Sequence, residues 1–151
     1  MGLDGGTVLG AGRGYCQFLD QRVELGATAG DGGLDVVRTT AFGGDSISSN
    51  SGVLYEVHGK TEVVLHDFCT SNPCKDGTQP GMIGVTQSGA QTLLGATTTG
   101  GNNAAGVAYS FDTKRKKEQF LLAFCRKTNC TDGETPSGPL AASGDGSVGL
   151  T

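Results

Sequence analysis

The sequence predicts an all-β protein made of propeller-like repeat units of about 57 residues, and three observations lead to this prediction. Glycine is abundant, with 27 in 151 residues, whereas tryptophan is absent. Glycine supplies the positive φ of tight turns and destabilises helix interiors, so this composition favours short strands. Short β-branched and aromatic runs alternate with turns, and one long segment recurs along the chain. A small β-barrel or a β-prism would use similar elements and stays an alternative.

The repeat is visible when the segment from Thr39 is placed beside the segment from Ala96. The first reads TTAFGGDSISSNSGVLYEVHGKTEVVLHDFCTSNPCKDGTQPG, and the second reads ATTTGGNNAAGVAYSFDTKRKKEQFLLAFCRKTNCTDGETPSG. Their Gly-Gly pairs are 57 positions apart, and their Phe-Cys and Asp-Gly-x-x-Pro elements are 56 apart. We therefore divide the chain into a divergent first unit, a second unit and a third unit, which span 1–40, 41–97 and 98–151.

Each unit is predicted to hold three or four strands. The runs 52–57 and 106–111 alternate approximately between apolar and polar residues, as expected for strands with one buried face. They lead through turns into 61–68 and 119–124, so each pair predicts a hairpin. Further strands are expected at 81–85 and 91–95.

Four consecutive basic residues, 114–117, occupy the place that a plain glycine turn fills in the other copy. We interpret this run as the exposed tip of a hairpin, with an anionic-ligand patch as the alternative. The net charge of −4 gives no electrostatic reason to expect nucleic acid as a partner. No run approaches the roughly 18 apolar residues that a membrane-spanning helix needs, so no membrane span is expected.

Two patterns, LHDFC-x4-C-x-DG-x2-P and LLGATTTGGNNAAGVAYSF, resemble the Gloeo/Verruco repeat family of bacterial proteins. The resemblance covers about residues 39 to 151. It implies long arrays of β-repeats on exported proteins, to which no activity is generally assigned, and therefore an extracellular or cell-surface location. The first 38 residues depart from this pattern because they lack the cysteine pair and the Phe-Cys element.

The cysteines carry the strongest chemical signal. Cys69 and Cys74 stand at the same phase of the repeat as Cys125 and Cys130, so we predict one local disulfide in each unit. Disulfides indicate an oxidising compartment. The alternatives are four thiolates around one zinc ion, which adjacent blades would hold too far apart, and fully reduced thiols. Cys16 is left over, either buried as a small apolar residue or linked to another chain.

No catalytic residues, metal site or cofactor are predicted. The glycines of 9–14 lack the spacing of a dinucleotide-binding loop, and neither His58 nor His66 has a counterpart in the other copy. We expect a non-enzymatic extracellular scaffold or binding module, with a glycan or a protein as partner. Ligand contacts are expected at the loops that contain Gly43, Gly44, Gly100, Gly101, Asn102 and Asn103.

Two other functions stay open at this point. The chain could be part of a propeller enzyme in which His58, His66 or Arg38 meet at the central channel. It could also be half of a propeller that closes with a second copy, because propellers have about four to eight blades. We accordingly expect a homo-oligomer, and the lack of a signal peptide at Met1 is compatible with export if this is the mature segment.

Overall fold

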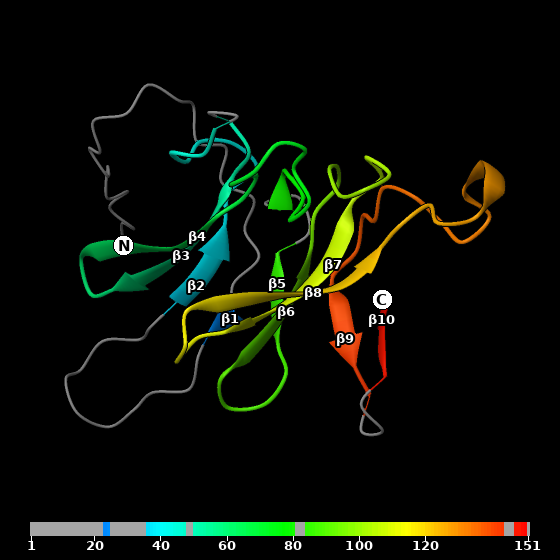
Figure 1. Cartoon of the computed structure of the whole chain (residues 1–151). Coiled ribbons are helices and arrows are strands. Elements are labelled where there is room, and N and C mark those ends of the chain that lie inside the picture. The colour runs from blue at the N-terminus through cyan, green and yellow to red at the C-terminus, as the bar shows by residue number, and fades with distance from the viewer. Residues whose placement is uncertain (1–22, 25–35, 48–49, 81–83, 144–146, 151) are drawn as a thin grey trace, which may run out of the picture.

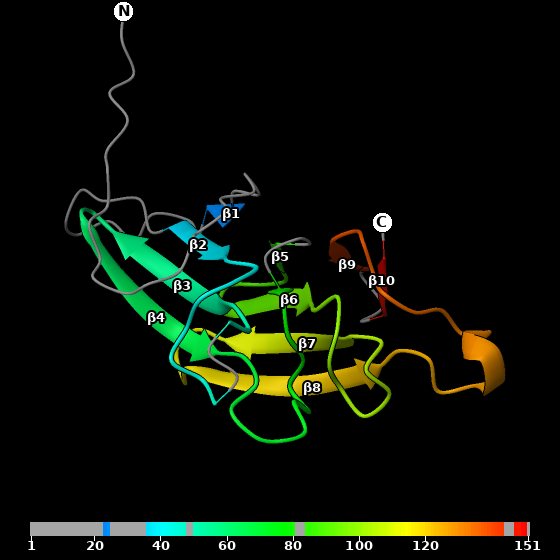
Figure 2. The same cartoon turned by 90° about the horizontal axis from the view of Figure 1, so that it is seen from above.

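The computed structural model describes residues 23–24, 36–47, 50–80, 84–143 and 147–150. These residues form three antiparallel sheets, which lie side by side in chain order (Figures 1 and 2). One turn of 3-10 helix, η2 (Thr128–Cys130), is also present, and no α-helix occurs within the described ranges. The predicted all-β class is confirmed.

The first two sheets are four-stranded meanders with the same strand order. The first sheet runs β1 (Val23–Glu24), β2 (Val36–Thr39), β3 (Val53–His58) and β4 (Thr61–Asp67). The second sheet runs β5 (Val85–Gln87), β6 (Thr92–Ala96), β7 (Val107–Asp112) and β8 (Lys117–Ala123). A hairpin of β9 (Leu140–Ala142) and β10 (Val148–Leu150) forms the third sheet.

Equivalent backbone hydrogen bonds occur in both four-stranded sheets. Thr40 donates its N–H to the carbonyl of Val53 at 2.9 Å, and Thr97 donates to Val107 at 2.9 Å. Each threonine hydroxyl in turn accepts the N–H of that same valine at 3.1 Å. The sequence repeat is therefore also a structural repeat.

A β-bulge recurs at the same place in the two sheets. The extra residue is Leu65 in β4 and Leu121 in β8. The residues on either side of Leu65 pair with β3, and those on either side of Leu121 pair with β7. A bulge bends its strand and increases its twist. The repeat thus preserves an irregular feature as well as the strand order.

Two apolar clusters hold the sheets together. The cluster between the first two sheets contains Val37, Leu54, Phe68, Val85, Leu93, Tyr109 and Phe111, with Leu65 at its edge. The other face of the second sheet packs against β9 through Leu94, Ala96, Ala105, Ala108, Phe124 and Leu140, with Leu122 and Cys125 at its edge. Leu93 and Leu94 point into different clusters because neighbouring residues of a strand face opposite sides.

The predicted hairpins are present, with one strand displaced. The basic run forms the turn between β7 and β8, where Lys114, Arg115 and Lys116 are exposed. The strand expected at 81–85 instead begins at Val85, while 81–83 lie outside the described residues. Gly84 has a φ of 73°, which interrupts an extended backbone, so the strand starts after it. The unit boundaries at 40/41 and 97/98 fall between β2 and β3 and between β6 and β7.

Candidate ligand-binding site

Both predicted cysteine pairs lie at disulfide distance. Cys69 is bonded to Cys74, and Cys125 to Cys130, each closing a loop of five positions. The second loop projects away from the sheets in both views (Figures 1 and 2). Two disulfides are compatible with an oxidising, extracellular environment. Cys16 lies outside the described residues.

An aspartate in each loop binds the loop's own backbone. Asp76 accepts the N–H of Thr70 at 3.3 Å, and Asp132 accepts the N–H groups of Arg126 and Lys127 at 3.0 and 3.1 Å. The N–H of Lys127, helped by that of Arg126, holds the pKa of Asp132 below its usual range although desolvation opposes the shift. The aspartate of each Asp-Gly dipeptide therefore stabilises the conformation of its own loop.

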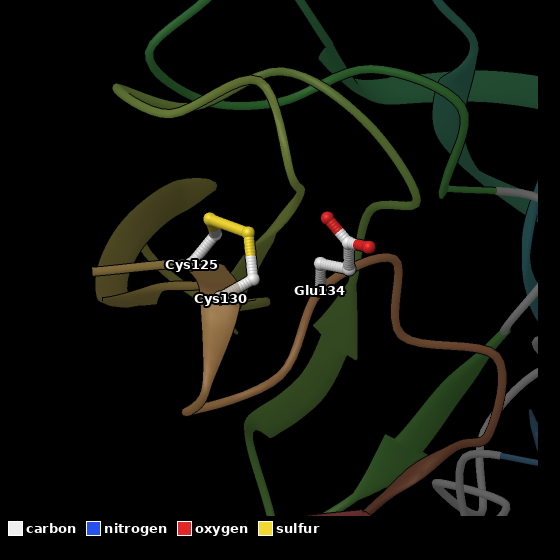
Figure 3. Close-up of side chains that lie close together, drawn as sticks. All are labelled: Cys125, Cys130 and Glu134. Atoms are coloured by element: carbon white, nitrogen blue, oxygen red, sulfur yellow. A yellow bond between two sulfur atoms is a disulfide. The ribbon is translucent and has the colours of Figure 1, made fainter. Parts of the chain in front are cut away.

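A metal site at the second loop is blocked by its disulfide. Among the described residues, Cys125, Cys130 and Glu134 alone form a group of three metal-ligating side chains whose atoms lie within 4.8 Å (Figure 3). Both sulfurs are bonded to each other, and a thiolate is the form of cysteine that binds metals. Only the carboxylate of Glu134 keeps a ligand atom, which is too few for a site.

The two Gly-Gly turns have different surroundings. The turn at Gly43 and Gly44 lies at the surface, where both residues have positive φ. The turn at Gly100 and Gly101 packs against the first disulfide loop, because Gly101 donates its N–H to the carbonyl of Cys74 at 2.7 Å. The two loops lie side by side in both views (Figures 1 and 2). The second turn therefore joins one unit to the next.

A hollow of about 360 Å³ lies where the two units meet, lined by Lys75, Asp76, Asn102, Glu118 and Phe120. Lys75 and Asp76 come from the first disulfide loop, Asn102 follows the second Gly-Gly turn, and the other two belong to β8. Phe120 is 49 % exposed. The structure thus brings the predicted contact residue Asn102 together with charged and aromatic groups from both units.

A second hollow continues from the first along β8. It shares Asn102 and Phe120 with the first hollow and is also lined by Asn103, Leu121, Leu122, Ala123 and Arg126. The Asn103 side chain donates to the carbonyl of Phe124 at 3.1 Å, so it fixes the loop beside this hollow. Of the predicted contact residues, the two asparagines line hollows, whereas the glycines shape the turns.

Polar groups without hydrogen-bond partners lie beneath the first hollow. His66 of β4 places its Nε2 atom 3.5 Å from Asp76 Oδ2 and 3.8 Å from Glu118 Oε2. Within the described part of the chain, His66 Nε2, Asp76 Oδ1, Glu118 Oε1 and the hydroxyl of Tyr109 are buried and lack a hydrogen-bond partner. These four residues, which we call the inter-sheet cluster, connect β4, the first disulfide loop, β7 and β8.

The environment moves the pKa values of the two carboxyl groups in opposite directions. Burial tends to raise the pKa of Asp76, but His66 and the N–H of Thr70 outweigh it and hold this pKa below the usual range. Burial raises the pKa of Glu118; His66 opposes the rise, and the Asp76 carboxylate adds to it. Burial, with Glu118 nearby, also raises the pKa of Tyr109, so its hydroxyl stays protonated.

The other residues considered for a catalytic site do not converge on this cluster. His58 is exposed at the turn between β3 and β4, at the opposite end of that hairpin from His66. Arg38 lies on β2 opposite Tyr55. The basic hairpin tip borders a separate hollow of about 300 Å³, in which Asp112 and Glu118 accompany Arg115 and Lys117. Carboxylates thus offset the cations at that tip.

Sequence reasoning considered His66 only for a propeller enzyme, and it missed Glu118 and Phe120 as site residues. One signal was present for His66, because the equivalent position of the next unit is Leu122, and a histidine that breaks a repeat is unusual there. Glu118 gives no such signal, since Glu62 occupies its equivalent position. Its proximity to Asp76 arises only when the two units stack.

The fold and site define an all-β repeat protein with disulfide-closed loops. No known protein family, curated protein or solved structure matches the chain. Among the residues that the structure describes, none belongs to a helix long and apolar enough to cross a membrane.

Proposed function

We propose that the chain is a non-enzymatic binding module built from propeller-like β-repeats and displayed outside the cytoplasm. Two four-stranded meanders of equal topology stack face to face, as propeller blades do. The first strand of the second sheet, β5, contacts β1, β2 and β9. A gathering of the first strands is the arrangement expected around a propeller axis.

Export is supported by the two disulfides and by the repeat pattern that resembles the Gloeo/Verruco family. Both loops are exposed for most of their length, so reducing conditions would reach them. Neither disulfide is needed to bring distant strands together, since each bridges five positions. Their role is to rigidify surface loops beside the hollows.

The ligand that best fits the first hollow is a glycan. Its lining combines an exposed aromatic face at Phe120 with the carboxylates of Asp76 and Glu118, the amide of Asn102 and the amine of Lys75. Sugar hydroxyls donate to carboxylates and accept from amines and amides, while the apolar face of a sugar ring packs on an aromatic ring. This mixed lining, contributed by two units, is the observation that carries the proposal.

Binding to a glycan array, followed by calorimetry with the best saccharide, tests this proposal. We expect Phe120→Ala to weaken binding at least tenfold, because among the described residues it is the only aromatic side chain of the lining. Val64→Ala is the matched control: Val64 holds the equivalent position of β4 and is 48 % exposed. Equal affinities for both variants, or binding of a protein but no saccharide, would contradict the glycan proposal.

Self-association is the second part of the proposal. Three sheets are fewer than the roughly four to eight blades that close a propeller, so closure would need units from a second copy or from a longer array. Light scattering should give the mass of a dimer, and a thiol count in denaturant should find one free thiol. A monomer with five free thiols would overturn both the assembly and the export proposals.

A further inference from the structure

We propose that His66 is a proton-operated clamp between the two sheets: when charged, its Nε2–H bridges Asp76 of the first disulfide loop and Glu118 of β8. This inference concerns the stability of the interface between the sheets. It does not depend on any glycan in the hollow above.

The geometry of His66 favours a proton on Nε2. This atom lies between two carboxylate oxygens, 3.5 and 3.8 Å away, and is otherwise without a partner in the described structure. The imidazole ring also stands perpendicular to the ring of Phe68, with centroids 4.8 Å apart, and tilted to Phe111 at 6.4 Å. Aromatic rings and carboxylates both attract an imidazolium more strongly than a neutral imidazole.

The charges around His66 determine which of its protonation states stabilises the contact between the sheets. Asp76 and Glu118 are only 12 % and 13 % exposed, so with a neutral imidazole two negative charges share one poorly hydrated site. Their repulsion loosens the contact between the first disulfide loop and β8. The other titratable groups nearby are the hydroxyl of Tyr109 and the exposed amine of Lys75 at the rim of the hollow. A proton on His66 offsets one of these two negative charges.

A metal ion does not fit this cluster as well as a proton does. The ligand atoms of His66, Asp76 and Glu118 do not form a group within 4.8 Å of one another, whereas the imidazole nitrogen lies near both carboxylates. A tetrahedral site with bonds of about 2.1 Å would require ligand atoms roughly 3.4 Å apart on every edge. The arrangement instead suits one N–H shared between two acceptors.

The repeat offers an internal comparison. Asp132, the equivalent of Asp76, uses both oxygens for the N–H groups of its own loop, whereas Asp76 has one oxygen facing His66. Leu122 stands where the third unit would need a histidine, and it packs against the apolar cluster on that side. The clamp is therefore a feature of one interface and is not required by the repeat itself.

The test is the melting temperature of the full chain in EDTA, measured from pH 8 to pH 6. Between pH 8 and 6 we expect the wild-type melting temperature to rise by about 3 °C, which is within the size of shift that one interaction produces in a domain of this length. We expect the melting temperature of Glu118→Gln to depend less on pH than that of the wild type, because one of the two acceptors of the clamp has lost its charge.

Two variants keep the proposal falsifiable. His66→Gln should abolish the pH-dependent rise, whereas His58→Gln should retain it. The proposal is overturned if His66→Gln keeps the pH-dependent rise or if Glu118→Gln leaves it unchanged. It is also overturned if stabilisation depends on added Zn²⁺ and not on pH.

Discussion

Replacing Tyr109 by phenylalanine should stabilise the protein, although it removes a polar group from the core. Tyr109 is fully buried, and its hydroxyl has no hydrogen-bond partner among the residues described. Phenylalanine keeps the ring that packs 5.1 Å from Phe68. The substitution therefore removes a dehydrated hydroxyl while it preserves nearly all apolar contacts.

The expected gain can be estimated from the cost of the unpaired hydroxyl. A buried polar group without a partner costs about 1–3 kcal/mol, and the small gap that the lost oxygen leaves offsets part of this. We therefore expect the free energy of unfolding to rise by about 1 kcal/mol, which corresponds to roughly 2–4 °C in melting temperature.

The assay is guanidinium denaturation followed by circular dichroism with both disulfides intact. Tyr55→Phe is the matched control, because Tyr55 occupies the equivalent strand position, is 4 % exposed and is engaged in an interaction. It should show no gain. A loss of 1 kcal/mol or more in Tyr109→Phe would mean that the hydroxyl is bonded, and would refute our account of the inter-sheet cluster.

Three further outcomes are expected from denaturation experiments. Gly106→Ala should lower the free energy of unfolding by about 2 kcal/mol or more, because the residue has a φ of 93° and a Cβ would collide with the carbonyl of Thr97. Gly133→Ala is the control: its φ is 91°, but nothing lies within 4 Å of the added Cβ, so the loss should be only about 1–2 kcal/mol. Replacing both Cys69 and Cys74 by alanine should cost about 2 kcal/mol, the closure entropy of a five-position loop, and added reductant, which opens both disulfides, should cost the wild type about twice as much. The pKa of Asp132 is lowered in the folded state, so its contribution to the free energy of unfolding is present above its usual pKa and is lost as the pH falls below that value. Asp132→Asn should therefore make the free energy of unfolding less dependent on pH below about pH 4.

Local elements of this fold were predictable because their determinants are close in sequence. The glycine pairs, the hairpin turns and the disulfides depend on residues a few positions apart, and the repeat showed each of them twice. The displaced strand illustrates the limit of pattern reading. Apolar residues alone suggested a start near 81, whereas the positive φ of Gly84 delays the strand to Val85.

The inter-sheet cluster was not predictable, since it depends on how the units stack. His66 and Glu118 are 52 positions apart and come from the outer strands of different sheets. No periodicity indicates that these strands face each other at that level. The burial that moves the pKa of Glu118 also exists only after stacking.

The repeat itself shows where function should be sought. Positions that serve the fold carry the same residue in both units, such as Gly52 and Gly106, whose missing side chains admit equivalent threonine carbonyls. His66 and Leu122 share a position but not a role: one meets two carboxylates, and the other packs against an apolar cluster. A fold that needed a histidine there would need it in both units. The difference therefore assigns His66 to one interface, so variants at this position report on the stability of that interface and not on the repeat fold itself.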